Sequence, residues 1–369
     1  MSIVSRQYIN IMKQQVFLLA ILVAFLTSCR HNHSSAPLKF TAYEGNPVLV
    51  PGEPGSWDDL GVGVPNIVWH DSVFYLFYMG RNIRGSIAIG LATSYDGVHF
   101  RKFRNNPILA PDDKGFDAFT VGPGIVVKDG SAWVMYYNAL ETAGFNPGPS
   151  IGRATAFVPT GPWTTKDTPV LTAGSKGEWD GDFVIPSSVV ALKSGNYIMY
   201  YTGGDNFVEG RNYFTGMATS TDGISWKKYN DPSTTQHPFE ESDPVFVAGK
   251  AGDWDSDWVW MANVSKFPGG FRMFYTGSSV KTNDVLTAIG YATSKDGINW
   301  ERFRGNPVFT PQDDPYTKAR PDIGCIENPN LLILDSTCFL YYDYGNPELK
   351  IGVAVGRSPD TFLQTQTAY

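Results

Sequence analysis

Carboxylate side chains give the most specific chemical signal in this sequence. Glu327 lies in the segment Cys325-Ile326-Glu327-Asn328-Pro329, and Asp59, Asp182 and Asp257 each stand before an apolar segment. Two facing carboxyl groups can divide acid–base work, because a protonated one donates a proton while an ionised one activates water or attacks carbon. This chemistry suits cleavage of a glycosidic bond, with Glu327 as the acid and Asp59 as base or nucleophile.

Glu327 differs from its surroundings because the corresponding segments elsewhere are apolar or small, such as Val62-Gly63-Val64-Pro65. A carboxylate in such a segment loses solvation, which raises its pKa. The alternative is a carboxylate that caps neighbouring backbone amides. Asp182 and Asp257 are expected to orient the substrate or to tune the pKa of the acid.

Other residues near these acids could bind a sugar. Indole faces stack on the apolar C–H faces of sugar rings, and acidic or cationic groups bind hydroxyl groups. The substrate-binding candidates are Asp58, Asp117, Asp257, Trp57, Trp179, Trp258, Glu141, Asp205, Asp343 and Arg320. Asp58 and Asp117 follow an aromatic residue, as Asp180 and Asp255 do, so a structural role at the start of a repeat is the alternative. For the tryptophans, the alternative is packing between sheets.

Repeated phrases indicate the elements that position these residues. An Asn-Pro-Val-like phrase occurs five times, with prolines at Pro47, Pro107, Pro169, Pro244 and Pro307, separated by 60, 62, 75 and 63 residues. An aromatic phrase such as Tyr197-Ile198-Met199-Tyr200-Tyr201 and a small-residue phrase such as Ile289-Gly290-Tyr291-Ala292-Thr293 also occur five times each. In three repeats an Asp-Gly step, at Asp96, Asp222 or Asp296, indicates a hairpin turn rather than a metal ligand.

Short strands at this period are typical of propeller blades. The first Asn-Pro-Val phrase precedes any complete repeat, and the last repeat lacks its own copy. We therefore predict an all-β fold, a five-bladed β-propeller of four-stranded antiparallel blades spanning residues 38–369. The N-terminal strand would complete the last blade and close the ring. In that arrangement, residues before each first strand and after each second strand meet at one mouth.

These phrases resemble the five-bladed glycosidase superfamily of arabinanases, levansucrases, invertases and related mannoside phosphorylases. Met199-Tyr200-Tyr201-Thr202-Gly203 and Ile289-Gly290-Tyr291-Ala292-Thr293-Ser294 carry the likeness, which covers nearly the whole chain after the N-terminal segment. The resemblance implies an aspartate in the first blade, a supporting aspartate in another and a glutamate acid in a later one. Glu327-Asn328-Pro329 matches the Glu-x-Pro acid motif. The chain departs from the pattern at Val64 and Gly122, which stand where aspartates are expected.

Two other functions remain open from the sequence. A glycoside phosphorylase would need cations for phosphate, and the candidates are Arg81, Arg84, Arg211 and Arg320. A glycan-binding protein without turnover would explain Val64 and Gly122, and its binding would survive loss of Glu327.

Composition excludes several other classes. The 369 residues are 42% hydrophobic, which is too apolar for a disordered chain, and 38 Gly with 25 Pro exclude a long helical bundle. The net charge of −7, without a basic run, argues against a nucleic-acid partner. The five histidines lack metal-ligand spacing, and neither a Gly-Lys-Ser/Thr loop nor a Gly-x-Ser-x-Gly elbow occurs. We expect no cofactor, no metal, a carbohydrate substrate and a monomer.

The N-terminal residues resemble an export signal. Residues 16–26 are apolar, and Leu26-Thr27-Ser28-Cys29 looks like a lipobox. We expect a lipoprotein signal peptide at 1–28, a lipid-modified Cys29, a tether at 29–37 and attachment to the bacterial outer membrane through the lipid alone. A plain signal peptide cleaved nearby is the alternative. Cys325 and Cys338 are expected to be buried and unpaired, at opposite ends of one hairpin.

Overall fold

The computed structural model describes residues 38–357, except 113, 145–146, 193–194, 206–212, 282–283, 321 and 346–348. The expected signal peptide, tether and lipidated Cys29 lie outside the described residues, as does Arg211. Among the described residues, no helix has the length and apolar character needed to cross a membrane.

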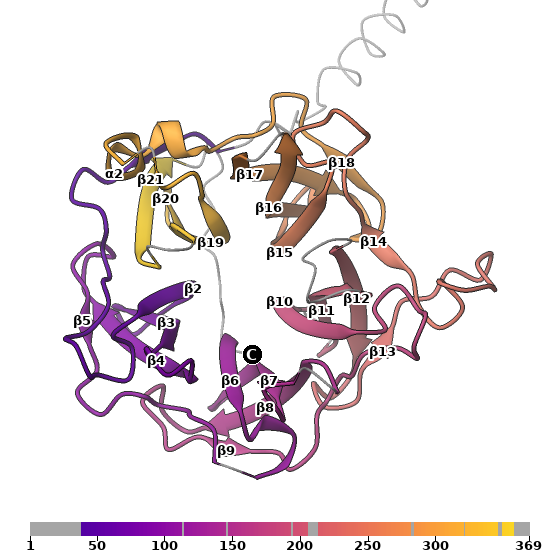
Figure 1. Ribbon diagram of the computed structural model, residues 1–369, viewed down its shortest axis with the longest axis horizontal. Helices are drawn as coiled ribbons and strands as arrows, with labels where there is room; N and C mark the ends of the chain where they lie inside the picture. Colours follow the sequence, from indigo (N-terminus) through magenta and orange to yellow (C-terminus); the bar gives the residue numbers. More distant parts are fainter. Residues whose placement is uncertain are drawn as a thin grey trace, which may run out of the picture. The chain divides into compact units, whose positions relative to one another are not determined.

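The described chain is all-β, with helical turns only at η1 (Gly115–Asp117), η2 (Pro311–Asp313) and α2 (Pro315–Lys318). Three-stranded antiparallel units follow one another along the chain (Figure 1). We number them first to fifth: β2 (Gly61–His70), β3 (Val73–Arg81) and β4 (Ile87–Ser94); β6 (Thr120–Asp129), β7 (Ala132–Leu140) and β8 (Ser150–Ala156); β10 (Phe183–Ala191), β11 (Tyr197–Gly204) and β12 (Phe214–Ser220); β15 (Trp258–Phe267), β16 (Gly270–Lys281) and β17 (Asp284–Ser294); β19 (Glu327–Leu334), β20 (Thr337–Asp343) and β21 (Ile351–Arg357).

Short strands border the third strand of each unit. They are β5 (Arg101–Lys102), β9 (Thr164–Thr165), β13 (Lys227–Lys228), β14 (Pro244–Phe246), β18 (Trp300–Arg302) and β1 (Phe40–Ala42). β1 comes from the N-terminal end of the described chain, yet it pairs antiparallel with β21, with Phe40 opposite Gly356. Leu49 of the first Asn-Pro-Val phrase likewise pairs with Ile351, as Leu109 does with Ile89 inside the first unit. The N-terminal Asn-Pro-Val phrase therefore borders the third strand of the fifth unit, as the later copies of the phrase border the third strands of the first four units.

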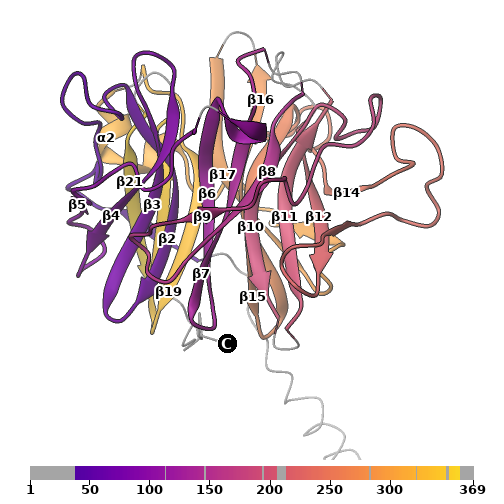
Figure 2. The ribbon, with the colours of Figure 1, turned by 90° about the horizontal axis from the view of Figure 1, so that it is seen from below.

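The first strands of the units contact each other in sequence. β2 contacts β6, which contacts β10, then β15, then β19, and β19 contacts β2. Figure 1 shows these five strands facing a common centre, and Figure 2 shows the strands side by side from another direction. Side-chain acceptors join neighbouring first strands: Asn66 accepts from the amide of Val126 at 2.9 Å, and Asn330 accepts from that of Ile67 at 3.0 Å.

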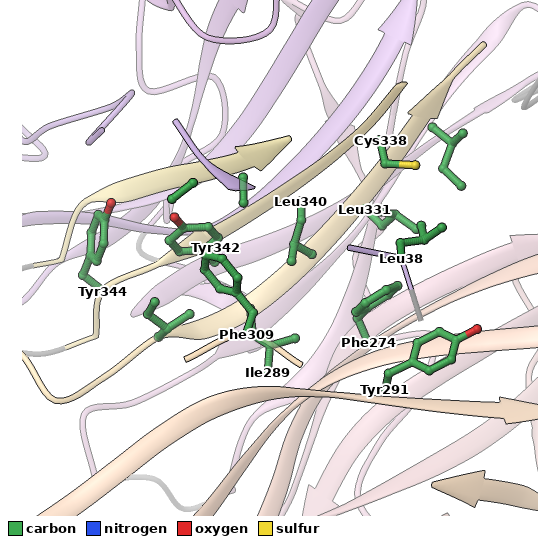
Figure 3. Packing of buried hydrophobic residues seen from close by; sticks show 14 of the residues in the cluster. Leu38, Phe274, Ile289, Tyr291, Phe309, Leu331, Cys338, Leu340, Tyr342 and Tyr344 are labelled. Carbon is green, nitrogen blue, oxygen red and sulfur yellow. The ribbon is translucent and has the colours of Figure 1, made fainter. Parts of the chain in front are cut away.

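The core lies between neighbouring units. Figure 3 shows one interface, where Phe274 and Ile289 of the fourth unit pack with Leu340 and Tyr342 of the fifth. The small-residue phrase has a physical reason here: a Cβ on Gly290 would lie 2.4 Å from the ring of Tyr275. Because the aromatic phrase of the second strand covers the third strand closely, only glycine fits at this position.

The three Asp-Gly steps form the expected turns. Gly97, Gly223 and Gly297 all have positive φ, between 66° and 82°. The carboxylate of Asp222 accepts hydrogen bonds from the amides of Ile224 and Ser225, at 2.8 and 2.7 Å. These bonds hold the pKa of Asp222 below its usual range, so its carboxylate is fully committed to the turn.

Candidate functional site

Glu327 and Asp343 come together at one end of the hairpin β19–β20. Glu327 is the first residue of β19, Asp343 is the last of β20, and the strand register places them opposite each other. The register shifts between Glu327 and Asn330, so β19 is bulged at this point. Asp343 is fully buried and Glu327 is partly buried. A pair of carboxyl groups thus lies within a low-dielectric part of the fold.

Several donors surround the carboxylate of Asp343. Oδ2 accepts from the amide of Val64 at 2.7 Å and from Nδ2 of Asn328 at 2.8 Å. Oδ1 accepts from the amide of Gly345 at 3.3 Å. Val64 belongs to the first unit, so this carboxylate also connects β2 to the fifth unit. Donors of this kind favour the ionised form of a carboxyl group.

Glu327 has the opposite electrostatic balance. Burial raises its pKa to about 7, aided by the negative charge of Asp343, while the Thr287 hydroxyl works in the other direction. Burial also raises the pKa of Asp343, to about 6, and its hydrogen-bond donors lower it. The pair therefore holds one proton near neutral pH, and the donors around Asp343 place that proton on Glu327. Such a protonated carboxyl group is suited to general acid catalysis.

Asn328 connects this pair to an aromatic surface. Its Oδ1 accepts from the indole Nε1 of Trp260 at 2.9 Å, while its Nδ2 donates to Asp343. The Trp260 ring lies 5.1 Å from the ring of Tyr213, and Tyr213 lies 6.4 Å from Trp258. Trp258 and Trp260 are both partly exposed. Aromatic faces of this kind provide apolar platforms beside the acid pair.

Unusual backbone conformations occur at the bulges of the first strands. Val64, Met261 and Asn328 have φ of 47°, 48° and 55°, and each lies at a register shift in its strand. A positive φ is a steric outlier for β-branched valine, and such strain concentrates at functional sites. Val64 and Met261 pack with Ile185 in one apolar cluster, so three units meet next to the Asp343 network.

The other aspartates predicted to act in catalysis or to orient the substrate lie just before the first strands of other units. Asp59 is two residues before β2, and its oxygens accept from the amides of Gly55 at 2.7 Å and Ile83 at 3.0 Å. Asp182 is exposed directly before β10, and Asp257 is partly exposed directly before β15. Their catalytic and substrate-orienting roles stay predictions.

Four substrate-binding candidates make packing or hydrogen-bond contacts within their own units. Asp58 is 2% exposed, and it accepts from Lys102 Nζ at 2.6 Å and from the Tyr78 hydroxyl at 3.2 Å. Asp117 accepts from the Tyr137 hydroxyl at 2.7 Å, and burial raises its pKa. Trp57 packs on Tyr78, and buried Trp179 stacks on Tyr201. These contacts are the ones that the structural alternative expects at the aromatic-Asp steps, and the substrate-binding role of the four residues stays a prediction.

The other predicted residues are spread over separate places. Glu141 and Asp182 line a cavity of about 660 Å³ together with Phe116 and Lys176. Asp205 is exposed just after β11. Arg320 lies 3.5 Å from Asp322 and over the ring of Tyr316. Cys325 and Cys338 are free, as expected, but Cys325 is only partly buried.

Sequence reasoning missed Asn328, Thr287 and the role of the Val64 backbone. Asn328 could have been found, because it lies inside the Glu327-Asn328-Pro329 motif. Thr287 lies on β17, where it pairs in parallel with Cys325, two residues before Glu327, and nothing in the local sequence signals that proximity.

No family model matches this chain. An uncharacterised protein of Mycobacterium tuberculosis is 27% identical over 240 residues, which cover 63% of this chain and 72% of that protein.

Solved structures resemble the fold over most of the chain. A glycosyl hydrolase from Bacteroides ovatus has a TM-score of 0.65 at 20% identity, over 89% of this chain and 96% of its own. A second structure comes from work on the GH130 family of mannoside phosphorylases, a family said there to contain glycoside hydrolases that target β-1,2 mannosidic linkages in Candida mannan. It has a TM-score of 0.68 at 20% identity, over 90% of this chain and 98% of its own. A thermostable family-43 glycoside hydrolase has a TM-score of 0.60 at 20% identity, over 86% and 94%. The resemblance expected from the repeats is confirmed for the fold: this chain has the β-propeller-type fold of these glycoside hydrolase and phosphorylase families.

Proposed function

We propose that this protein is a glycoside hydrolase in which Glu327 is the general acid, on a five-bladed propeller closed by its N-terminal strand. The observation that carries the proposal is the Glu327–Asp343 pair, in which burial and a neighbouring carboxylate raise the pKa of Glu327 to about 7. The similarity to glycoside hydrolase structures supports the same reaction class. The cyclic contacts among the first strands and the β1–β21 pairing support the closed ring.

The proposed mechanism assigns the proton first. Protonated Glu327 donates to the leaving glycosidic oxygen as the bond to the anomeric carbon breaks. Asp343 stays ionised, because three donors stabilise its charge, and it keeps the proton on Glu327 until the transfer. Trp258 and Trp260 offer faces for sugar stacking beside the acid.

A second carboxylate must activate water or attack the anomeric carbon. We propose Asp59 for this role, with Asp182 and Asp257 orienting the substrate. Asp59 lies two residues before β2, and the amide of Val64 near the start of that strand donates to Asp343, so Asp59 lies at the end of the first unit that contacts the acid pair. The proposal includes export as a lipid-anchored outer-membrane protein, which rests on the sequence around Cys29 alone.

The test is product release from furanosidic and pyranosidic oligosaccharides by the wild-type protein and by Glu327→Gln. We expect product from the wild type and a fall of roughly 10²-fold or more in the variant, the scale of lost acid catalysis. Glu301→Gln, a change of the same type on β18 at an exposed position, is the matched control and should keep full activity.

Other outcomes would change the assignment. Equal activity in Glu327→Gln moves the acid to another residue. Cleavage that requires inorganic phosphate identifies a phosphorylase instead. Sugar binding without product in either protein identifies a glycan-binding protein without turnover.

A further inference from the structure

A histidine and two glutamates meet on the outer side of the third unit. They are far in sequence from Glu327 and Asp343, which belong to the fifth unit. Glu178 precedes β10, whereas His237 and Glu240 belong to the loop between β13 and β14, which projects from the outer edge of the unit (Figure 1). One ligand atom from each of the three side chains lies within 4.8 Å of the others. This loop accounts for the longest interval between successive Asn-Pro-Val prolines, from Pro169 to Pro244.

Glu178 is the unusual member of the cluster because it is fully buried. Its Oε2 accepts from the amide of Glu241 at 3.0 Å. Its Oε1 is also buried, and its neighbour is His237 Nδ1, which forms an ion pair with it when the imidazole is protonated. Lys228, a nearby cation, is already paired with Asp180 at 2.7 Å. The positive charge that this buried carboxylate needs therefore comes either from a protonated His237 or from a bound cation.

The other two side chains face the same point from the solvent side. His237 Nε2 lies 3.6 Å from Glu240 Oε2, and both side chains are more than half exposed. An ion could therefore reach the cluster from water while Glu178 holds it from below. One imidazole nitrogen with two carboxylates is a donor set that Zn²⁺ and similar transition metals accept, with water as a further ligand. Two carboxylates also balance the charge of a divalent ion.

We propose that Glu178, His237 and Glu240 form a divalent transition-metal site that fastens this loop to the third unit. The loop is already tied down beside the site: the carbonyl of Pro238 accepts from the amide of Trp179 at 2.9 Å, and Ser242 accepts from the Trp179 indole at 3.0 Å. A metal would add a bond across 59 residues of sequence and would stabilise the folded state by mass action. The role is structural and independent of the proposed glycosidase activity.

The test uses Zn²⁺ as the probe with the full chain, stripped of metal by a chelator. Zinc content after equilibrium dialysis and Tm by thermal unfolding are measured for the wild type, His237→Gln and Glu240→Gln. His99→Gln is the matched control, because His99 contacts a single carboxylate, Asp96, at 2.8 Å on another surface turn. Glu178 is left unchanged, since replacing a buried carboxylate can unfold the chain.

We expect the wild type and His99→Gln to bind one more Zn²⁺ per chain than His237→Gln. Glu240→Gln should bind that ion roughly ten-fold more weakly or worse. Zn²⁺ should raise the Tm of the wild type by about 2 °C or more, and much less in His237→Gln. Equal zinc content in the wild type and His237→Gln overturns the site, and so does equal loss in His99→Gln. Bound zinc without a change in Tm overturns the fastening role.

Discussion

The acid pair shows how two chemically similar residues acquire different protonation. Asp343 has donors from Val64, Asn328 and Gly345, whereas the Thr287 hydroxyl is the group that lowers the pKa of Glu327. Burial acts on both, so the donors decide which group ionises first. The geometry thus keeps a proton on Glu327 and a charge on Asp343, an arrangement that acid catalysis requires at near-neutral pH.

Replacing Asp343 with asparagine should change the pH profile in one direction. The charge of Asp343 raises the pKa of Glu327, so Asp343→Asn lowers that pKa, and the acid loses its proton at lower pH. The basic limb of the kcat/KM profile, set by Glu327 near pH 7 in the wild type, should move down by roughly one pH unit. Steady-state rates from pH 4 to 9 measure it.

The control is Asp335→Asn at the exposed turn of the same hairpin, which should leave the basic limb in place. An unmoved limb in Asp343→Asn would show that Asp343 does not set the acidity of Glu327.

The short outer strands act at the scale of the element. On β13, Lys227 is exposed, while Lys228 reaches inward and pairs with fully buried Asp180, which also accepts from the Tyr201 hydroxyl at 3.0 Å. Lys102 binds Asp58 and Arg302 binds Asp255 in the same way. A strand of two or three residues is thereby attached to its unit by an ion pair as well as by its backbone.

Lys228→Ala should therefore be costly, because it leaves the Asp180 carboxylate buried without its cation. We expect a loss of about 3 to 5 kcal/mol in the free energy of unfolding. Lys227→Ala, one residue away on the same strand, should change it by less than about 0.5 kcal/mol. Urea unfolding followed by tryptophan fluorescence compares the two variants, and similar losses would contradict the ion-pair role.

The elements were more predictable than the site. Repeated phrases predicted the strands and the Asp-Gly turns, because each phrase reflects a local requirement such as the glycine under Tyr275. Glu327 was also predictable, since it breaks a repeated apolar pattern. Its pairing with Asp343 depends on the register of a bulged hairpin, and the Glu178–His237 contact depends on a long loop, so spacing along the chain revealed neither.

Across the whole molecule, side-chain acceptors join the first strands of neighbouring units. Asn330 accepts from Ile67 and so links the fifth unit to the first, while Ser188 accepts from the amide of Val264 at 3.0 Å and links the third to the fourth. These bonds satisfy buried backbone amides that no strand partner reaches. The arrangement of the units therefore depends on a few polar side chains as well as on apolar packing.

Asn330→Ala tests this link at the junction of the first and fifth units. The change leaves the buried amide of Ile67 without an acceptor, and we expect a loss of about 1 to 3 kcal/mol in the free energy of unfolding. Asn105→Ala, at an exposed position, is the matched control and should be nearly neutral. Equal stability of both variants in urea unfolding would contradict the role of Asn330.

The pairing of β1 with β21 has a consequence for the synthesis of this protein. Asn46 donates to the carbonyl of Val353, 307 residues later, so the earliest described strand meets its partner only after the residues between them have been synthesised. Until then both edges are exposed and could pair with other chains. Pairing of β1 with β21 therefore removes these two edges only at the end of folding.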